Sequence, residues 1–119
     1  MTYLLINDDS NKGTASVIKK NPDHIDIGSL VGGWFDCVTT EDGVLVGYVN
    51  DSGLIDGLPA NIHASLIFGR PLYGPCVLVG GRSPEGEYDG ENHPVPEHIV
   101  SAILRADGTF ALRPDRIDA

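Results

Sequence analysis

The chain has 119 residues, a length typical of one domain that buries its own core without a disulfide or a metal. Its hydrophobic content of 41% is typical of a globular protein rather than a disordered one. The formal net charge is -9, from 8 Lys+Arg and 17 Asp+Glu, which disfavours direct binding to nucleic acid or to an anionic membrane surface because like charges repel.

The sequence shows no sign of secretion or membrane insertion. No segment approaches the roughly 18 apolar residues of a membrane-spanning helix. The first residues, MTYLLINDD, have no basic region before their short apolar run. We therefore expect a cytoplasmic protein in which Cys37 and Cys76 are reduced, buried thiols. The alternative is a disulfide between them, which could form on oxidation if their strands are neighbours.

The first half of the chain alternates short apolar runs with polar turns. Strands are predicted at Tyr3–Ile6, Thr14–Lys19, Trp34–Thr39 and Val44–Val49. A short helix is predicted over Asp26–Val31, with its apolar residues on one face and Gly32-Gly33 at its end. Residues 41–43, Glu-Asp-Gly, predict a hairpin turn. Gly47 predicts a bulge or the close approach of another backbone.

The middle of the chain predicts a second helix and the most buried strand. The helix covers Ile62–Phe68, with Asn61 as its start signal, and its apolar spacing predicts that it is mostly buried. The segment Leu54–Leu58 before it stays ambiguous. Cys76–Val79 is the most apolar run and therefore the predicted central strand.

The last part of the chain predicts one more helix and little else. Pro96 opens this helix at a favoured first position. Its apolar stripe is Ile99, Val100, Ile103 and Leu104. Residues 109–112 predict a short strand, and residues 114–119 a frayed tail. We expect one compact α+β domain over residues 1–119, with a mostly antiparallel sheet of about four to six strands packed with about two or three short helices.

Four motifs of the chain resemble a known family when taken in order. They are Leu30–Gly33 (LVGG), Tyr48–Gly53 (YVNDSG), Gly57–Asn61 (GLPAN) and Gly74–Gly80 (GPCVLVG). They resemble a small domain of unknown function found mostly in phages, plasmids and mobile elements of actinobacteria, over Ile27 to Leu104. The resemblance implies an accessory protein acting in a bacterial cytoplasm, and it carries over no catalytic residue. The motif glycines and Asn61 also fit turns and a helix cap.

A long acidic loop at residues 82–95 departs from that family pattern. Its carboxylates are Glu85, Glu87, Asp89 and Glu91. Loops of this length in a compact domain are usually functional or mobile. A weak cation site is one interpretation, although the D-x-[DN]-x-[DN]-G calcium pattern is absent. Docking on a basic partner is another, since exposed charge speeds encounter.

Trp34 is the second candidate for binding. It precedes Phe35, and neighbouring residues of a strand point to opposite faces of the sheet. An exposed Trp34 would be a strong anchor for a partner, whereas a buried one would belong to the core. The sequence leaves both alternatives open.

Other reactive residues do not assemble into a motif. His93 and His98 lie near two glutamates, but prolines interrupt the segment and the spacing matches no zinc pattern. Cys37 has no base or helix N-terminus nearby to activate it, which predicts a thiol of the core. No phosphate-binding glycine loop occurs. We predict no catalytic residue, no metal and no cofactor.

Together these features predict a non-enzymatic protein that binds and modulates a host bacterial protein, one with a basic surface, through an acidic face. One alternative is a nucleic-acid mimic whose carboxylates are spaced like phosphates and block a host DNA-binding protein of restriction or another defence. Another is a small ligand-binding domain or enzyme with a pocket near Gly32-Gly33 and Asn61. An exposed edge strand could also pair two copies into a homodimer.

Overall fold

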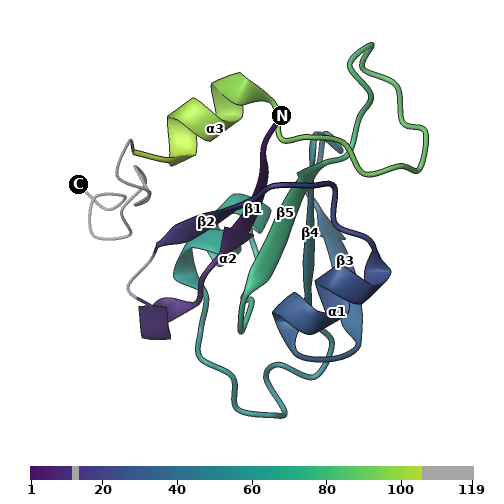
Figure 1. Ribbon diagram of the computed structural model, residues 1–119. Coiled ribbons are helices and arrows are strands. Elements are labelled where there is room, and N and C mark those ends of the chain that lie inside the picture. Colours follow the sequence, from purple (N-terminus) through teal and green to yellow (C-terminus); the bar gives the residue numbers. More distant parts are fainter. Residues whose placement is uncertain (12–13, 106–119) are drawn as a thin grey trace.

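The fold is organised around a five-stranded sheet with the strand order β2-β1-β5-β4-β3, and each neighbouring pair is antiparallel. A computed structural model describes residues 1–11 and 14–105 (Figure 1). The strands are β1 Tyr3–Ile6, β2 Ala15–Ile18, β3 Phe35–Thr39, β4 Leu45–Asn50 and β5 Cys76–Gly80. The helices are α1 His24–Val31, α2 Ile62–Phe68 and α3 Glu97–Ile103, with a short 3-10 turn, η1, at Asp9–Asn11. The predicted α+β architecture is confirmed.

Strand β5 lies at the centre of the sheet, as its apolar composition predicts. Each of its residues is buried. Its side chains alternate between the two faces. Leu78 packs with Leu4 in one core cluster, and Val77 packs with Ile27 in another. The sheet therefore separates two hydrophobic cores.

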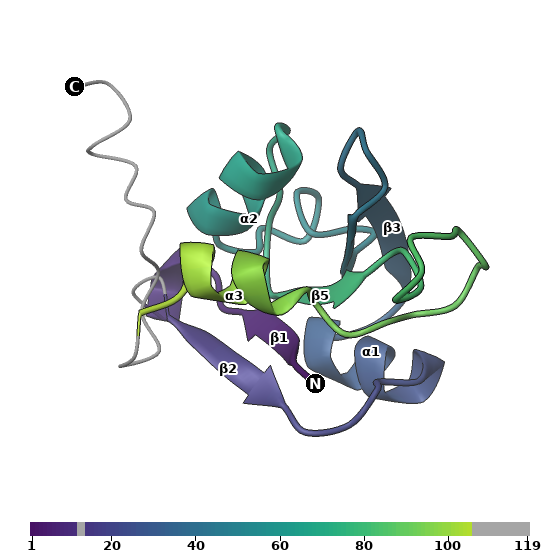
Figure 2. The ribbon, with the colours of Figure 1, turned by 90° about the horizontal axis from the view of Figure 1, so that it is seen from above.

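Helices cover both faces of the sheet. Helix α1 packs on the face with Val77 through Ile27 and Val31. Helices α2 and α3 cover the opposite face, where Ala64 and Ile103 join the larger core cluster. The view from above shows α1 and α2 on opposite sides of the strands (Figure 2). The polypeptide thus forms three layers.

Helix α1 begins two residues earlier than predicted because Asp23 caps it. The Asp23 carboxylate accepts a hydrogen bond from the N–H of Asp26 at 2.8 Å, and the Asp26 carboxylate accepts one from the N–H of Asp23 at 3.1 Å. This reciprocal pair is a capping box. The helix ends at Gly32, whose φ of 86° is left-handed.

Helix α2 has the predicted bounds, but its predicted burial is only partly right. Ala64 is fully buried, whereas Ile62 and Leu66 are exposed because the helix turns that side away from the sheet. Phe68 packs over Gly47 of β4. A Cβ atom at Gly47 would lie 2.7 Å from the Phe68 ring, so the close neighbour is a side chain and not, as was predicted, another backbone. The register runs through Gly47 without a bulge.

Helix α3 starts after Pro96, which occupies the N-cap rather than the first helical position. Ile103 is buried, and Ile99 and Val100 are half-buried against the core. The strand predicted at residues 109–112 and the tail predicted at 114–119 lie outside the described residues.

The two cysteines differ from the sequence-based expectation. Cys76 is fully buried on β5, but Cys37 is exposed, so its predicted place in the core is wrong. The reason is that β3 is an edge strand, so Cys37 has a neighbouring strand, β4, on one side only among the described residues. Strand β4 separates the strands of the two cysteines, and both thiols are free.

Candidate functional site

The acidic loop projects from the sheet but is held at its base. Gly80 and His93 exchange two backbone hydrogen bonds of 2.7 and 2.9 Å. Arg82 donates from Nε and Nη2 to the Asp42 carbonyl at 3.0 and 2.8 Å, and from Nη1 to the Gly86 carbonyl at 3.1 Å. These contacts join the loop to the β3–β4 hairpin.

The four predicted carboxylates of the loop are all exposed, but they are not equivalent. Asp89 pairs with His93, since both carboxylate oxygens lie 2.9 Å from Nε2. The hydrogen bonds from the His93 side chain and from the N–H of Glu91 hold the pKa of Asp89 below its usual value. Within the described residues, no ion pair or hydrogen bond engages the carboxylates of Glu85, Glu87 and Glu91. These three carboxylates are free to meet a partner.

Trp34 stands at the edge of an apolar groove. It is 84% exposed, so the exposed alternative holds. Ile25 of α1 is 67% exposed and lines the same groove, which passes over Gly28 and encloses about 400 Å³. Two large apolar side chains open to solvent beside a groove are an arrangement that partner proteins use as anchor points.

A second groove joins Trp34 to the acidic loop. It encloses about 400 Å³ and shares His24 and Phe35 with the first groove, and it reaches Glu91 and Asn92. We call the residues His24, Ile25, Trp34, Phe35 and Glu91 the α1 surface.

The floor of the second groove is held by side-chain contacts. The Tyr48 hydroxyl donates to the Asn92 side-chain oxygen at 2.6 Å, and the Phe35 and Tyr48 rings meet edge to face at 5.4 Å. Burial raises the pKa of Tyr48, so its hydroxyl stays protonated as the donor. The α1 surface is therefore built on the sheet rather than on the loop alone.

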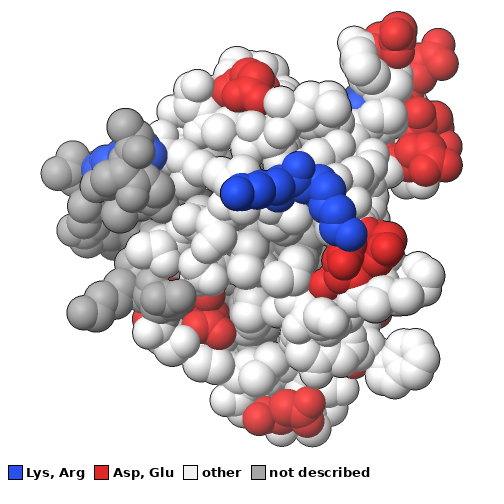
Figure 3. Space-filling model, viewed as in Figure 1, with Lys and Arg blue, Asp and Glu red and all other residues white. Residues whose placement is uncertain are grey.

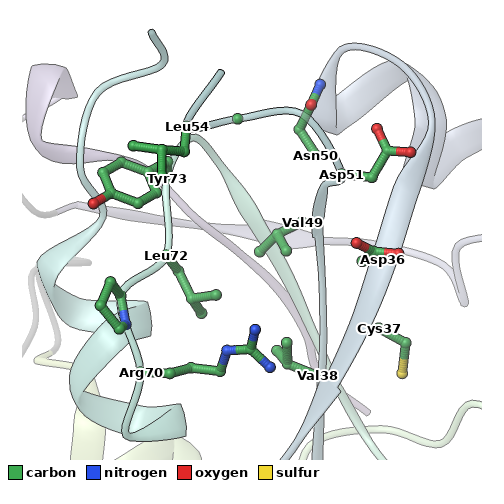
Figure 4. A pocket seen from close by; sticks show the side chains of 12 residues that line it. Asp36, Cys37, Val38, Val49, Asn50, Asp51, Leu54, Arg70, Leu72 and Tyr73 are labelled. Atoms are coloured by element: carbon green, nitrogen blue, oxygen red, sulfur yellow. The ribbon is translucent and has the colours of Figure 1, made fainter. Parts of the chain in front are cut away.

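A third hollow lies on the opposite face of the sheet, beside the edge strand β3. This edge pocket encloses about 280 Å³ between β3, the end of β4 and residues 70–73. Figure 4 shows Arg70 reaching into it, with Asp36 and Asp51 on the opposite wall and the apolar side chains of Val49 and Leu72 in the floor. Asp36, Asp51 and Arg70 are all exposed.

The sequence did not predict the edge pocket. Its residues lie far apart in the chain: the β3–β4 register pairs Asp36 with Val49, and residues 70–73 meet them across the fold. Asn61 lines none of the three hollows described above. Its side chain is fully buried and donates to the carbonyls of Ile6 and Gly74 at 3.1 and 2.8 Å. The pocket expected at Asn61 is therefore not found there, although Gly33 lines the groove beside Trp34.

Two kinds of reactive centre, a metal cluster and an activated thiol, are absent from the described residues. Residues 1–11 and 14–105 contain no group of three or more His, Cys, Asp or Glu side chains arranged to hold a metal ion. Burial, and after it the charge of Asp36, raises the pKa of Cys37, which keeps this thiol protonated at neutral pH and weakens it as a nucleophile. No helix among these residues has the length and apolar character needed to cross a membrane.

These features define a small α+β domain whose candidate sites are open grooves. The chain belongs to the family described as Domain of unknown function (DUF3846), whose model matches residues 1–98. The match includes β1 and β2, so it begins well before Ile27, where the motif resemblance begins. No curated protein and no solved structure matches the chain significantly.

Proposed function

We propose that this chain is a non-enzymatic accessory protein of a phage or mobile element, which binds a basic host bacterial protein through the α1 surface and the acidic loop and so modulates it. The observation that carries the proposal is the continuity of the two grooves, which connect the exposed Trp34 to Glu91 at the base of the loop. The phage or mobile-element setting comes from the motif resemblance alone.

Two properties of the chain support binding: an exposed tryptophan and a negative charge. A tryptophan that loses its solvent exposure in a complex is among the strongest single contributors to binding. The net charge of -9 and the free carboxylates of the loop attract a basic surface and raise the rate of encounter. The apolar groove would then hold a partner that the charge has brought close.

The nucleic-acid mimic is not favoured by the surface. Figure 3 shows acidic side chains gathered on the projecting loop and in separate clusters elsewhere on that face, with uncharged residues and a stripe of Lys or Arg side chains between them. A mimic would present carboxylates in a continuous row at the spacing of phosphates.

An affinity capture with matched variants tests the proposal. The tagged chain is incubated with a nuclease-treated actinobacterial lysate at low and at moderate salt, and the retained proteins are identified by mass spectrometry. We expect one dominant protein, and expect Trp34→Ala to lower its retention about tenfold or more. Ile55→Ala is the control, because Ile55 is 89% exposed but lies outside the α1 surface.

The charge is tested in the same capture. Glu85→Gln with Glu87→Gln should reduce retention at low salt, whereas Glu41→Gln with Asp56→Asn, which removes the same charge elsewhere, should not. Equal retention by all variants would contradict the proposal. A retained protein that added DNA displaces would indicate the mimic instead.

A further inference from the structure

The edge strand β3 offers unpaired backbone groups that the proposed function leaves unused. Hydrogen-bonded pairs alternate along an antiparallel ladder. The N–H of Asp51 donates to the Trp34 carbonyl and the N–H of Thr40 donates to the Leu45 carbonyl, both at 3.1 Å. Even-numbered residues of β3 therefore bond to β4, and the N–H and C=O groups of Phe35, Cys37 and Thr39 point to the open edge.

The two edges of the sheet are not alike. The other edge strand, β2, is followed directly by Lys19 and Lys20, and lysines are a common device that discourages further pairing. Strand β3, FDCVT, carries no lysine and has Asp36, Cys37 and Thr39 exposed. Of the two edges, β3 is the one left open to pairing.

The edge pocket lies directly beside this open edge. Asp36 and Val38, on one face of β3, both line it. The backbone N–H and C=O groups of Asp36 point toward β4. An added antiparallel strand would therefore pair with Asp36 at a non-hydrogen-bonded position, where the side chains of opposite residues come closest. Asp51 stands on the same wall (Figure 4). A lysine or arginine of the added strand would meet these two carboxylates, which outnumber the one guanidinium, that of Arg70, on the facing wall.

We propose that β3 accepts an extended segment of a basic partner protein as an additional antiparallel strand, with a basic side chain placed against Asp36 and Asp51 in the edge pocket. Backbone hydrogen bonds supply affinity in this mode, and the pocket supplies specificity. A second copy of this chain is a poor occupant, because its own Asp36 and its charge of -9 would repel the edge.

The inference rests on the proposed function for the basic character of the partner, but it concerns a different surface. Trp34→Ala and the loop variants test the α1 surface. Changes at Asp36 and Cys37 test the edge, so either idea can fail while the other stands.

The test uses the ¹⁵N-labelled full chain and an N-acetylated, C-amidated hexapeptide of alternating lysine and valine. We expect saturating peptide to slow amide hydrogen exchange at Phe35, Cys37 and Thr39 by about tenfold or more, because these N–H groups gain acceptors. The same peptide N-methylated at every residue has no backbone N–H to donate and carries methyl groups along both edges, so it cannot pair and should leave exchange unchanged. A glutamate–valine hexapeptide should not bind.

Two protein variants complete the design. Cys37→Pro removes one outward N–H without removing a bond to β4, and should abolish the protection at Phe35 and Thr39. Cys37→Ala, the matched control, should keep it. Asp36→Asn should weaken lysine-peptide binding several-fold, whereas Glu41→Gln should not. If Cys37→Pro does not fold, the comparison of the two peptides on the unchanged protein still tests whether backbone pairing is needed.

Three results would overturn the inference. Shifts confined to residues 85–91 would mean that the peptide binds only the acidic loop. Equal binding of the N-methylated peptide would show that backbone pairing plays no part. Protection of β3 that grows with protein concentration in the absence of peptide would show that a second copy occupies the edge.

Discussion

Gly47 occupies the point where β4 passes beneath α2. A Cβ atom there would lie 2.7 Å from the Phe68 ring and 3.0 Å from the Cys76 sulfur. Gly47→Ala should therefore lower the free energy of unfolding by about 1–3 kcal/mol, as overpacked cores do. Urea unfolding measures the loss. With Phe68→Leu added, the combined loss should be smaller than the sum of the two single losses, and strict additivity would argue against the clash.

Asn61 is a buried polar side chain with each of its contacts satisfied. It accepts from the N–H of Ala64 at 3.1 Å and donates to the Ile6 and Gly74 carbonyls. Asn61→Ala removes a helix cap and leaves two carbonyl acceptors without their donor. We therefore expect the free energy of unfolding, measured in thermal or urea unfolding, to fall by about 2–4 kcal/mol. The exposed Asn21→Ala should cost about 1 kcal/mol or less. Equal losses would contradict a structural role for Asn61.

Cys37 is the accessible thiol and Cys76 the protected one. Burial raises the pKa of Cys76 to about 12, and burial with Asp36 raises that of Cys37. Native protein treated with iodoacetamide should be modified at Cys37 alone. Its rate should still rise with pH above the usual thiol pKa of about 8.5, because only the thiolate reacts. A plateau below that pH, or modification of Cys76 in the folded chain, would contradict this account.

At the scale of elements, the acidic loop depends on the contact between Asp89 and His93. The pKa of Asp89 is lowered in the folded state. Its stabilising contribution is therefore present above the unfolded pKa of about 3.9 and is lost as pH falls through the lower folded value. The amide signals of Glu91 and His93 should shift in an NMR titration with a midpoint below about 3.9. Asp89→Asn should abolish that shift, and a midpoint at or above the usual value would refute the contact.

Local patterns predicted most of the elements. The apolar run at Cys76–Val79 identified the central strand, and Asn61 with Gly69 bounds α2 as predicted. The start of α1 was missed because its capping box needs Asp23, three residues before the predicted start of the helix at Asp26. Local signals of caps and turns are short-range, so they can be read from neighbouring residues.

Edges and pockets could not be predicted in the same way. Whether Cys37 is buried depends on the place of β3 in the sheet, and among the described residues β3 is an edge strand with only β4 beside it. The edge pocket likewise requires Arg70 to meet the β3–β4 hairpin across the fold. The exposure of Trp34 was left open for the same reason. These properties follow from long-range pairing, which short-range patterns do not contain.

At the scale of the whole molecule, the candidate binding features lie on two surfaces: the α1 surface with the acidic loop, and the open edge of β3. The chain carries a net charge of -9, and its acidic loop and α1 surface lie together at one side of the sheet. The open edge of β3 adds a place where an extended segment could pair. Membership of the DUF3846 family extends over residues 1–98, so it includes every strand that forms this arrangement.

The most direct measurement of the central claim is site-specific photo-crosslinking in bacterial cells. A photoreactive benzoylphenylalanine replaces Trp34 in one version of the chain and Ile55 in another, since both side chains are strongly exposed. We predict one dominant crosslinked protein from position 34 and none from position 55. The same products from both positions, or no product from position 34, would contradict binding through the α1 surface.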